Sequence, residues 1–223
     1  MITSLRSTRI LARVAFALAG SAALGLPASA ATPDELIRPI QDQWAEIKYR
    51  QPEKQHAERY RTLASQARRV VEANPKLPEP LIWEGIVLSS EAGAEGGLGA
   101  LSLAKEARQR LDEALKIDDK ALGGSAYASL ATLYAKVPGW PVGFGDKERA
   151  EEYFRKALAI NPDGIDPNYF YGEYLSERGR QAEAVAHLEK ALKAPARPGR
   201  ELADSGRRQE VQTLLGKVKK DHR

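Results

Sequence analysis

The chain has 223 residues, of which 43% are hydrophobic and 29% are charged, a composition typical of a folded globular protein. It carries 34 basic and 30 acidic residues, and three of the basic ones, Arg6, Arg9 and Arg13, lie in the first thirty residues. The other 31 nearly balance the acidic residues, so the chain lacks the strongly basic character of a nucleic-acid-binding domain. With no cysteine, the sequence excludes disulfides, thiolate nucleophiles and lipid attachment through cysteine.

Residues 1–30 have the pattern of a secretory signal peptide. Arginines precede or interrupt a short apolar run over residues 11–26, which is followed by Ala28-Ser29-Ala30. We predict cleavage between Ala30 and Ala31 and a periplasmic mature protein without a membrane anchor. The alternative is a retained anchor, but the run falls short of the roughly 20 residues that span a bilayer.

After the leader, apolar residues recur every three or four positions between breakers such as Asn74-Pro75 and Asn161-Pro162, which predicts a succession of helices. Thr32 and Pro33 form a helix start, and Pro39 is expected to delay the regular part of that helix. Asp146 is expected to cap a later helix. The predicted helices cover residues 33–50, 53–73, 81–91, 101–117, 125–137, 147–160, 167–178, 181–193 and 201–220.

One pattern recurs at a fixed spacing. Ala150, Phe154 and Ala157 return 34 residues later as Ala184, Leu188 and Ala191. This is the period of the tetratricopeptide repeat (TPR), a helix–turn–helix unit that stacks into a solenoid. Gly172 and Leu175, like Gly85 and Leu88, stand where the first helix of such a repeat places a small and then a large apolar residue. The sequence therefore predicts an all-α, TPR-like solenoid over residues 31–223.

Two insertions interrupt the repeat pattern. The glycine-rich residues 92–100 do not match G-x-G-x-x-G and follow no strand, so they predict an irregular connector rather than a phosphate-binding loop. Residues 138–145, PGWPVGFG, have almost no polar side chain. Trp140 and Phe144 in this loop either pack back onto the solenoid or form a lip over a ligand or partner surface.

The helix predicted over residues 167–178 is expected to begin with Asp166 as its cap. Tyr169, Tyr171 and Tyr174 are distributed around it, so we expect that they cannot all face the core. Tyr169 and Glu173 lie one turn apart and are expected on the concave side of the solenoid, where such repeats bind ligands. They are candidate contact residues; the alternative is a half-buried tyrosine beside a surface carboxylate.

The last predicted helix should hide the final apolar face of the solenoid as a capping helix. Its basic residues, Arg207, Arg208, Lys217, Lys219 and Lys220, are interpreted as a solvated helix face, the alternative being a site for a partner or a lipid headgroup. No two histidines share one helix face, and no nucleophile or phosphate-binding motif is present. We therefore predict a protein with no catalytic residues, metal or cofactor.

The segment PGWPVGFGDKERAEEYFRKALAINPDGIDPNYFYGEYL resembles the T-component family of tripartite ATP-independent periplasmic (TRAP) transporters. The shared positions are Trp140, Pro141, Phe144, Gly145, Tyr169, Tyr171, Gly172 and Glu173. The resemblance implies an all-helical periplasmic protein that acts beside a solute-binding subunit, forms a homo-oligomer and handles a small apolar ligand. Members of that family are often lipid-anchored, which this chain cannot be.

These observations favour a non-catalytic protein that binds a protein partner, and the resemblance implies that this partner is the solute-binding subunit of a TRAP-type transporter. The candidate contact residues are Trp140, Phe144, Tyr169, Tyr171 and Glu173. One alternative is a carrier of a small apolar ligand, in which the four aromatic residues among them line a cavity. Another is a general envelope scaffold unrelated to transport.

Overall fold

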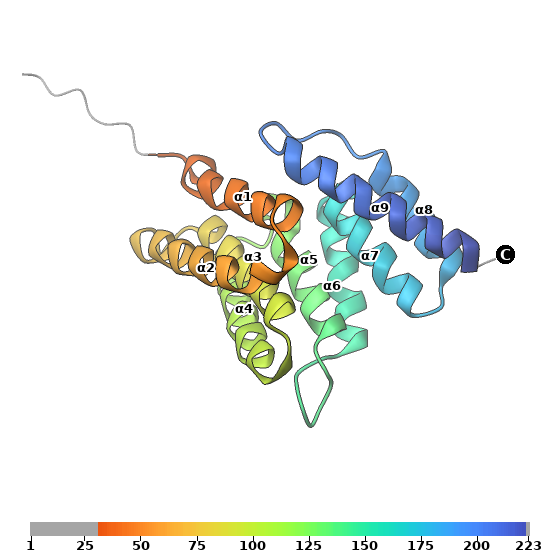
Figure 1. Ribbon diagram of the computed structural model, residues 1–223, viewed down its shortest axis with the longest axis horizontal. Coiled ribbons are helices and arrows are strands. Elements are labelled where there is room, and N and C mark those ends of the chain that lie inside the picture. Colours follow the sequence, from red (N-terminus) through yellow and green to blue (C-terminus); the bar gives the residue numbers. More distant parts are fainter. Residues whose placement is uncertain (1–30, 222–223) are drawn as a thin grey trace, which may run out of the picture. The chain divides into compact units, whose positions relative to one another are not determined.

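The computed structural model describes residues 31–221, and within this range it contains helices but no strand (Figure 1). The predicted leader lies outside the described residues. The helices are α1 (Pro33–Arg50), the short 3₁₀ helix η1 (Glu53–Gln55), α2 (His56–Ala73), α3 (Pro78–Glu95), α4 (Gly97–Ile117), α5 (Ala121–Lys136), α6 (Lys147–Ile160), α7 (Ile165–Glu177), α8 (Gln181–Leu192) and α9 (Glu201–Asp221). None of the helices described has the length and apolarity needed to cross a membrane.

Consecutive helices pack as pairs, α3 with α4, α5 with α6 and α7 with α8. The second helix of each pair presents two alanines and one large apolar residue to the core with the same spacing. The three sets are Ala107, Leu111 and Ala114; Ala150, Phe154 and Ala157; and Ala184, Leu188 and Ala191, all of them buried. The last two sets are 34 residues apart, and the first set is an earlier copy of the same pattern at a longer spacing. The repeated sequence pattern therefore corresponds to repeated packing, and the predicted TPR-like solenoid is confirmed.

Two glycines set how closely the paired helices approach. A Cβ atom on Gly85 would lie 2.7 Å from Leu111 Cγ and 3.2 Å from the carbonyl oxygen of Ala107. A Cβ atom on Gly172 would lie 2.9 Å from Leu188 Cγ. Since real Cβ atoms do not approach other carbons so closely, both positions need glycine for the same geometric reason, as the repeat pattern predicts.

The glycine-rich residues 92–100 are mostly helical, so the prediction of an irregular connector is wrong. α3 continues to Glu95, and the chain breaks only at Gly96, whose φ of 66° lies in the left-handed region. Arg61 on α2 pairs with Glu91 at 3.3 Å and with Glu95 at 2.8 Å. The last turn of α3 is therefore held against α2, and the inserted residues lengthen two helices.

Other expectations about where helices begin also differ from the structure. α1 continues through Pro39 without interruption, and α3 begins at Pro78. α7 begins at Ile165 with Gly164 at the N-cap position, so Asp166 lies in the first turn of the helix, where two arginines described below engage its side chain. By contrast, Asp146 caps α6 as predicted, accepting a hydrogen bond from the backbone of Arg149.

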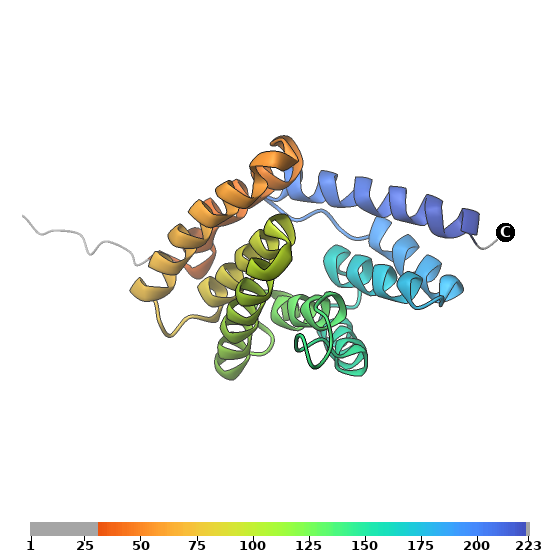
Figure 2. The ribbon, with the colours of Figure 1, turned by 60° about the horizontal axis from the view of Figure 1, so that its bottom comes forward.

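The C-terminal helix α9 caps the last repeat, as predicted, and also returns to the first helix. It packs against α7 and α8 and meets α1 at its N-terminal end (Figures 1 and 2). Figure 2 shows it spanning the distance between α1 and α8 along one side of the repeats. The first and last helices of the described chain are therefore joined, which the repeat pattern alone does not indicate.

Replacement of Gly172 by alanine tests the close approach of α7 and α8. The added methyl group would overlap Leu188, and overpacking of this kind costs about 1–3 kcal/mol. Gly216 is the matched control, because it lies on the exposed face of α9 and a Cβ atom there would have no other atom within 4 Å. Gly216→Ala should raise the free energy of unfolding by about 0.5–1 kcal/mol. Urea unfolding measures the free energy of unfolding of both variants. Equal changes in the two would contradict the close approach of α7 and α8 at Gly172.

Candidate functional site

The loop between α5 and α6 carries two of the predicted site residues, and they behave differently. Phe144 packs on Tyr134, with 5.5 Å between ring centroids, and the Arg108 guanidinium lies 4.5 Å from the Phe144 ring centre. Trp140 is 89% exposed. The loop extends beyond the helices at the bottom of Figure 1. Phe144 thus packs back onto the solenoid, whereas Trp140 projects from it.

Backbone hydrogen bonds close the base of this loop. The N–H of Gly145 donates to the Pro138 carbonyl at 2.9 Å, and the N–H of Asp146 donates to the Tyr134 carbonyl at 3.0 Å. A Cβ atom on Gly145 would lie only 1.8 Å from the Val137 carbonyl oxygen, so the two sides of the loop are in direct contact. Trp140 therefore projects from a closed base rather than from a loose segment.

The three tyrosines of α7 are all buried, so the prediction that they cannot all face the core is wrong. The reason is that α7 is covered on several sides, by α5, α6, α8 and α9. Tyr171 packs on Phe154 with 5.5 Å between ring centroids, and Tyr174 donates its hydroxyl proton to the Lys147 carbonyl. The ring of Tyr169 lies 4.5 Å from the guanidinium carbon of Arg207 on α9.

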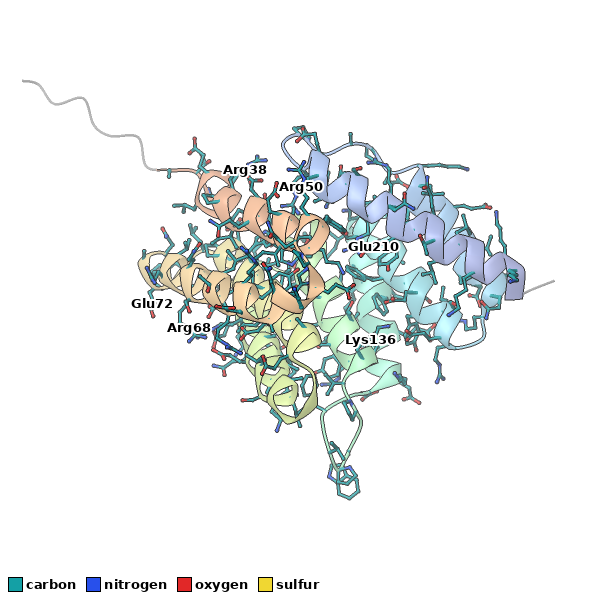
Figure 3. All side chains as sticks on the ribbon, in the orientation of Figure 1. Arg38, Arg50, Arg68, Glu72, Lys136 and Glu210 are labelled. Carbon is teal, nitrogen blue, oxygen red and sulfur yellow. The ribbon has the colours of Figure 1, made fainter. Side chains whose placement is uncertain are left out.

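Glu173 forms an ion pair with Lys136 at 3.1 Å, across α7 and α5. Figure 3 shows Lys136 near the end of α5 from which the loop departs. The five predicted residues therefore occupy separate places: Trp140 and Phe144 in the loop, Tyr169 and Tyr171 in the core, and Glu173 in a surface ion pair. The structure does not bring them together around one cavity.

A cavity of about 400 Å³ lies elsewhere, and none of the five predicted residues lines it. Its walls come from α1, α3, α5 and α7, the first helices of the successive pairs, and from the segment 197–207 that leads into and begins α9. Aromatic rings of Trp44, Trp83 and Phe170 form part of the lining. The inner face of the repeats is thus partly covered by the returning C-terminal segment.

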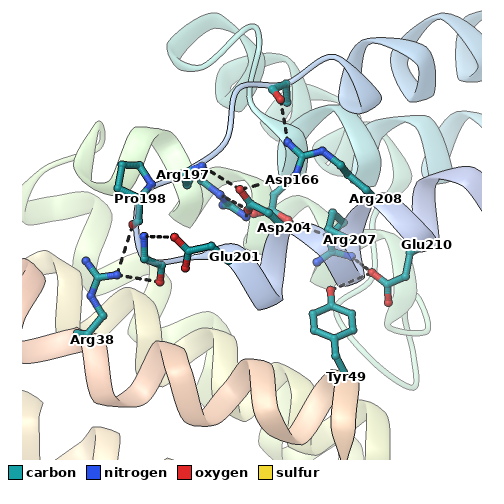
Figure 4. Close-up of polar contacts among 12 residues, drawn as sticks. Arg38, Tyr49, Asp166, Arg197, Pro198, Glu201, Asp204, Arg207, Arg208 and Glu210 are labelled. Carbon is teal, nitrogen blue, oxygen red and sulfur yellow. Dashed lines mark hydrogen bonds and ion pairs between the residues drawn. The ribbon is translucent and has the colours of Figure 1, made fainter.

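Asp166 is the centre of the polar network that holds this segment (Figure 4). One carboxylate oxygen accepts from Arg197 Nη1 at 2.7 Å and the other from Arg207 Nε at 2.8 Å. Arg197 also donates to Asp204 Oδ1 at 2.7 Å. Burial alone would raise the pKa of the Asp166 carboxyl, but the charges and hydrogen bonds of Arg207 and Arg197 lower its pKa to about 2.

Arg207 connects three helices. Its guanidinium lies 4.5 Å from the Tyr169 ring centre and 4.6 Å from the Phe170 ring centre on α7, and it donates to Glu210 on its own helix. Glu210 in turn accepts the hydroxyl proton of Tyr49 on α1 at 3.2 Å. A buried charge that is stacked and paired in this way fixes the position of α9 against both α7 and α1.

A second contact joins α1 to the segment before α9. Arg38 Nη1 donates to the carbonyl oxygen of Gly199 at 2.9 Å (Figure 4). Gly199 has a φ of 69°, and a Cβ atom on it would lie 1.9 Å from Arg38 Nη1. Any other residue would strain the left-handed turn and would push this guanidinium away from its present position.

The interpretation of Arg207 as part of a solvated basic face is wrong, because this side chain is buried and paired. The interpretation as a solvated face holds for Lys219, which is exposed and pairs with Glu189 on the surface. A signal for the buried charges is present in the sequence. Asp204 and Arg207 lie seven and four residues before Val211, and so they continue the apolar stripe of α9 toward its N-terminus.

The comparisons with known proteins agree with the fold. The family model of the tetratricopeptide repeat matches residues 143–163, which end the loop and include α6. No curated protein matches the chain. Together with the repeated helix pairs, this match defines a TPR-like helical repeat protein, a class that generally mediates protein–protein interactions and is typically a non-catalytic scaffold. Within residues 31–221, no three His, Asp or Glu side chains are grouped so that they could hold a metal ion.

Replacement of Asp166 by asparagine tests the network. The pKa of this carboxyl in the folded protein is about 2, below the ordinary 3.8. Its contribution to the free energy of unfolding is therefore complete above pH 3.8 and is lost as the pH falls toward 2. We expect Asp166→Asn to lower the free energy of unfolding by about 1–2 kcal/mol at pH 7, with the difference from wild type shrinking below pH 4.

Urea unfolding at pH 7, 5, 4 and 3 measures this difference. The control is Asp163→Asn, because Asp163 is an exposed carboxylate nearby whose surface ion pair with Lys190 should contribute about 0–1 kcal/mol. A difference between wild type and Asp166→Asn that stayed constant from pH 7 to pH 3 would show that the carboxylate charge does not hold the segment.

Proposed function

We propose that this protein is an exported, non-catalytic TPR-like protein that binds a protein partner through the loop 138–145, and that this partner is the solute-binding subunit of a TRAP-type transporter. The repeat fold supports partner binding in general. The leader pattern of residues 1–30 supports export to the periplasm. The resemblance of the loop and of the tyrosine-rich helix to T-components supports the choice of partner.

The exposure of Trp140 is the observation that carries the proposal. Three large hydrophobic side chains are exposed among the described residues, and two of them, Trp140 at 89% and Val142 at 64%, lie on this loop. Exposed loops are usually polar, and tryptophan is among the residues that most often dominate the binding energy of protein interfaces. A tryptophan and a valine together at a loop tip are therefore typical of a binding anchor.

The closed base of the loop supports the same conclusion. Phe144 and the hydrogen bonds of Gly145 and Asp146 fix the base of the loop to the end of α5, so the base is held in place without a partner. Association costs less free energy when the contact residues are held in place beforehand. The aromatic-lined cavity of the alternative hypothesis, formed by Trp140, Phe144, Tyr169 and Tyr171, has no support, because these side chains lie in separate places.

Replacement of Trp140 by alanine should abolish capture of the partner. We expect the tagged wild-type protein to recover a solute-binding protein from a periplasmic extract, and Trp140→Ala to weaken the purified complex by at least about 2 kcal/mol, roughly thirtyfold in Kd. Because Trp140 is exposed, the substitution should leave the thermal midpoint of unfolding unchanged. Titration calorimetry of the purified pair measures the affinity.

Ile117→Ala is the matched control, because Ile117 is the third exposed large hydrophobic residue and lies at the end of α4, outside the loop. It should leave the affinity unchanged. Recovery of wall-building or other envelope enzymes in place of a solute-binding protein would contradict the transporter partner and favour a general envelope scaffold. Equal binding by wild type and Trp140→Ala would contradict the loop as the contact surface.

A further inference from the structure

The cavity inside the repeats has more positive than negative charge in its lining. Four arginines and two aspartates contribute to it, namely Arg38, Arg197, Arg200, Arg207, Asp34 and Asp166. Three of these arginines have acceptors. Arg197 and Arg207 pair with carboxylates, and Arg38 donates to backbone carbonyls. The side chain of the fourth, Arg200, has no acceptor among the described residues.

The guanidinium of Arg200 makes no hydrogen bond or ion pair with any residue in the range 31–221, and its Nη1 atom is closed off from solvent. It lies 4.9 Å from the ring centre of Trp83, whose indole Nε1 also lacks an acceptor there. Burial, and then repulsion from Arg197, lower the pKa of Arg200. Both groups can only donate hydrogen bonds, so this wall of the cavity has a surplus of donors and of positive charge.

Glu84 shows how the same protein compensates a fully buried charge. Glu84, on α3, is fully buried, and its two carboxylate oxygens are met by Arg68 at 3.0 Å and by Arg110 at 3.1 Å. Figure 3 shows Arg68 on α2. Charges removed from water are normally compensated in this way, since an uncompensated one is costly. Arg200 is half-buried and has no such partner within the described chain, so its guanidinium is available to an anion from outside it.

A strained segment of α5 forms another part of the cavity wall. Leu122 has a φ of 48°, and Gly123 and Gly124 follow it in the left-handed region. Leu122 and Gly123 both line the cavity. A left-handed conformation is unfavourable for leucine, and such strain is found preferentially at binding sites. The left-handed conformation of Leu122 at the cavity wall is therefore consistent with a binding site there.

We propose that this cavity binds a small organic anion, with its charged oxygens paired to Arg200 and its apolar body against Trp44, Trp83 and Phe170. The positive charge of Arg200 indicates that the ligand is an anion. The aromatic lining indicates that the ligand also has an apolar body, because a free inorganic ion would leave these rings without contacts. A volume of about 400 Å³ lies within the range of small-molecule sites. This site is separate from the loop 138–145 and does not depend on the proposed partner.

Two fluorescent probes with the same ring system distinguish the charge from the apolar body. Anilinonaphthalene sulfonate carries an anionic group, and phenylnaphthylamine is the same molecule without it. We expect the purified protein to bind both, and Arg200→Met to weaken the sulfonate about tenfold while leaving the neutral probe unchanged. Arg69→Met is the matched control, because Arg69 is an exposed arginine of α2 outside the cavity and should leave both affinities unchanged.

A second variant ties the binding to the cavity. Ser129 is a half-buried residue of α5 in the lining, and Ser129→Trp should fill the space and abolish the binding of both probes. If Ser129→Trp still binds the probes, the probes bind outside the cavity, and the proposal that the cavity is the binding site is overturned. An equal loss of both probes in Arg200→Met, with the helical circular dichroism retained, would show that Arg200 only shapes the cavity. If Arg200→Met does not fold, Arg200→Lys should retain binding of the sulfonate and Ser129→Trp should still abolish it; failure of either expectation would overturn the proposal.

Discussion

The ion pairs of Asp166 with Arg197 and Arg207 determine how this structure closes. A row of helix pairs leaves the inner face of its first helices open, and here that face carries large aromatic rings on α1, α3 and α7. Such rings exposed over a wide area would promote association. The segment 197–207 covers them, and it is fixed by charge-assisted hydrogen bonds to α7 and by contacts of Arg38 and Tyr49 on α1.

Closure through charged groups has a consequence for the interior. Apolar side chains would pack into the remaining space and fill it, as they do between paired helices. Guanidinium groups and carboxylates must instead keep their hydrogen-bonding partners in a fixed geometry, so they cannot fill the space between them as freely. A cavity therefore remains where α9 meets the first helices, whereas the seams between α3 and α4 or α7 and α8 are tightly packed.

The sequence predicts the repeat fold well because its information is local and periodic. Helix faces, breakers and the spacing of Ala150, Phe154 and Ala157 depend on residues close together in the chain. Asp166 shows where this reasoning ends. Followed by proline, it has the ordinary features of a helix cap, but two arginines more than thirty residues later engage its side chain. No local pattern specifies that pairing, so the cavity that depends on it cannot be predicted from periodicity.

The candidate site residues illustrate the same limit. An apolar loop predicts that Trp140 and Phe144 differ from ordinary loop residues, but periodicity cannot say which of them packs on Tyr134. The expectation for the tyrosines of α7 assumes one open side, as in an isolated repeat row. The return of α9 closes that side, and Tyr169 is buried against Arg207 as a result. A prediction of the concave face thus requires knowing whether the ends of the row meet.

The helix α5 is the element that links the cavity to the loop. Ser125 and Ser129 line the cavity from the regular part of α5, which follows the left-handed residues 122–124, and the loop with Trp140 leaves from the C-terminal end of this helix. A hydrogen-bonded helix is stiff over this length, so a displacement at one end is carried to the other rather than absorbed between them. Binding at one end affects binding at the other only if the helix has two positions with different affinities. Neither Arg200 nor Trp140 lies on α5 itself, so a change of either side chain leaves this link intact.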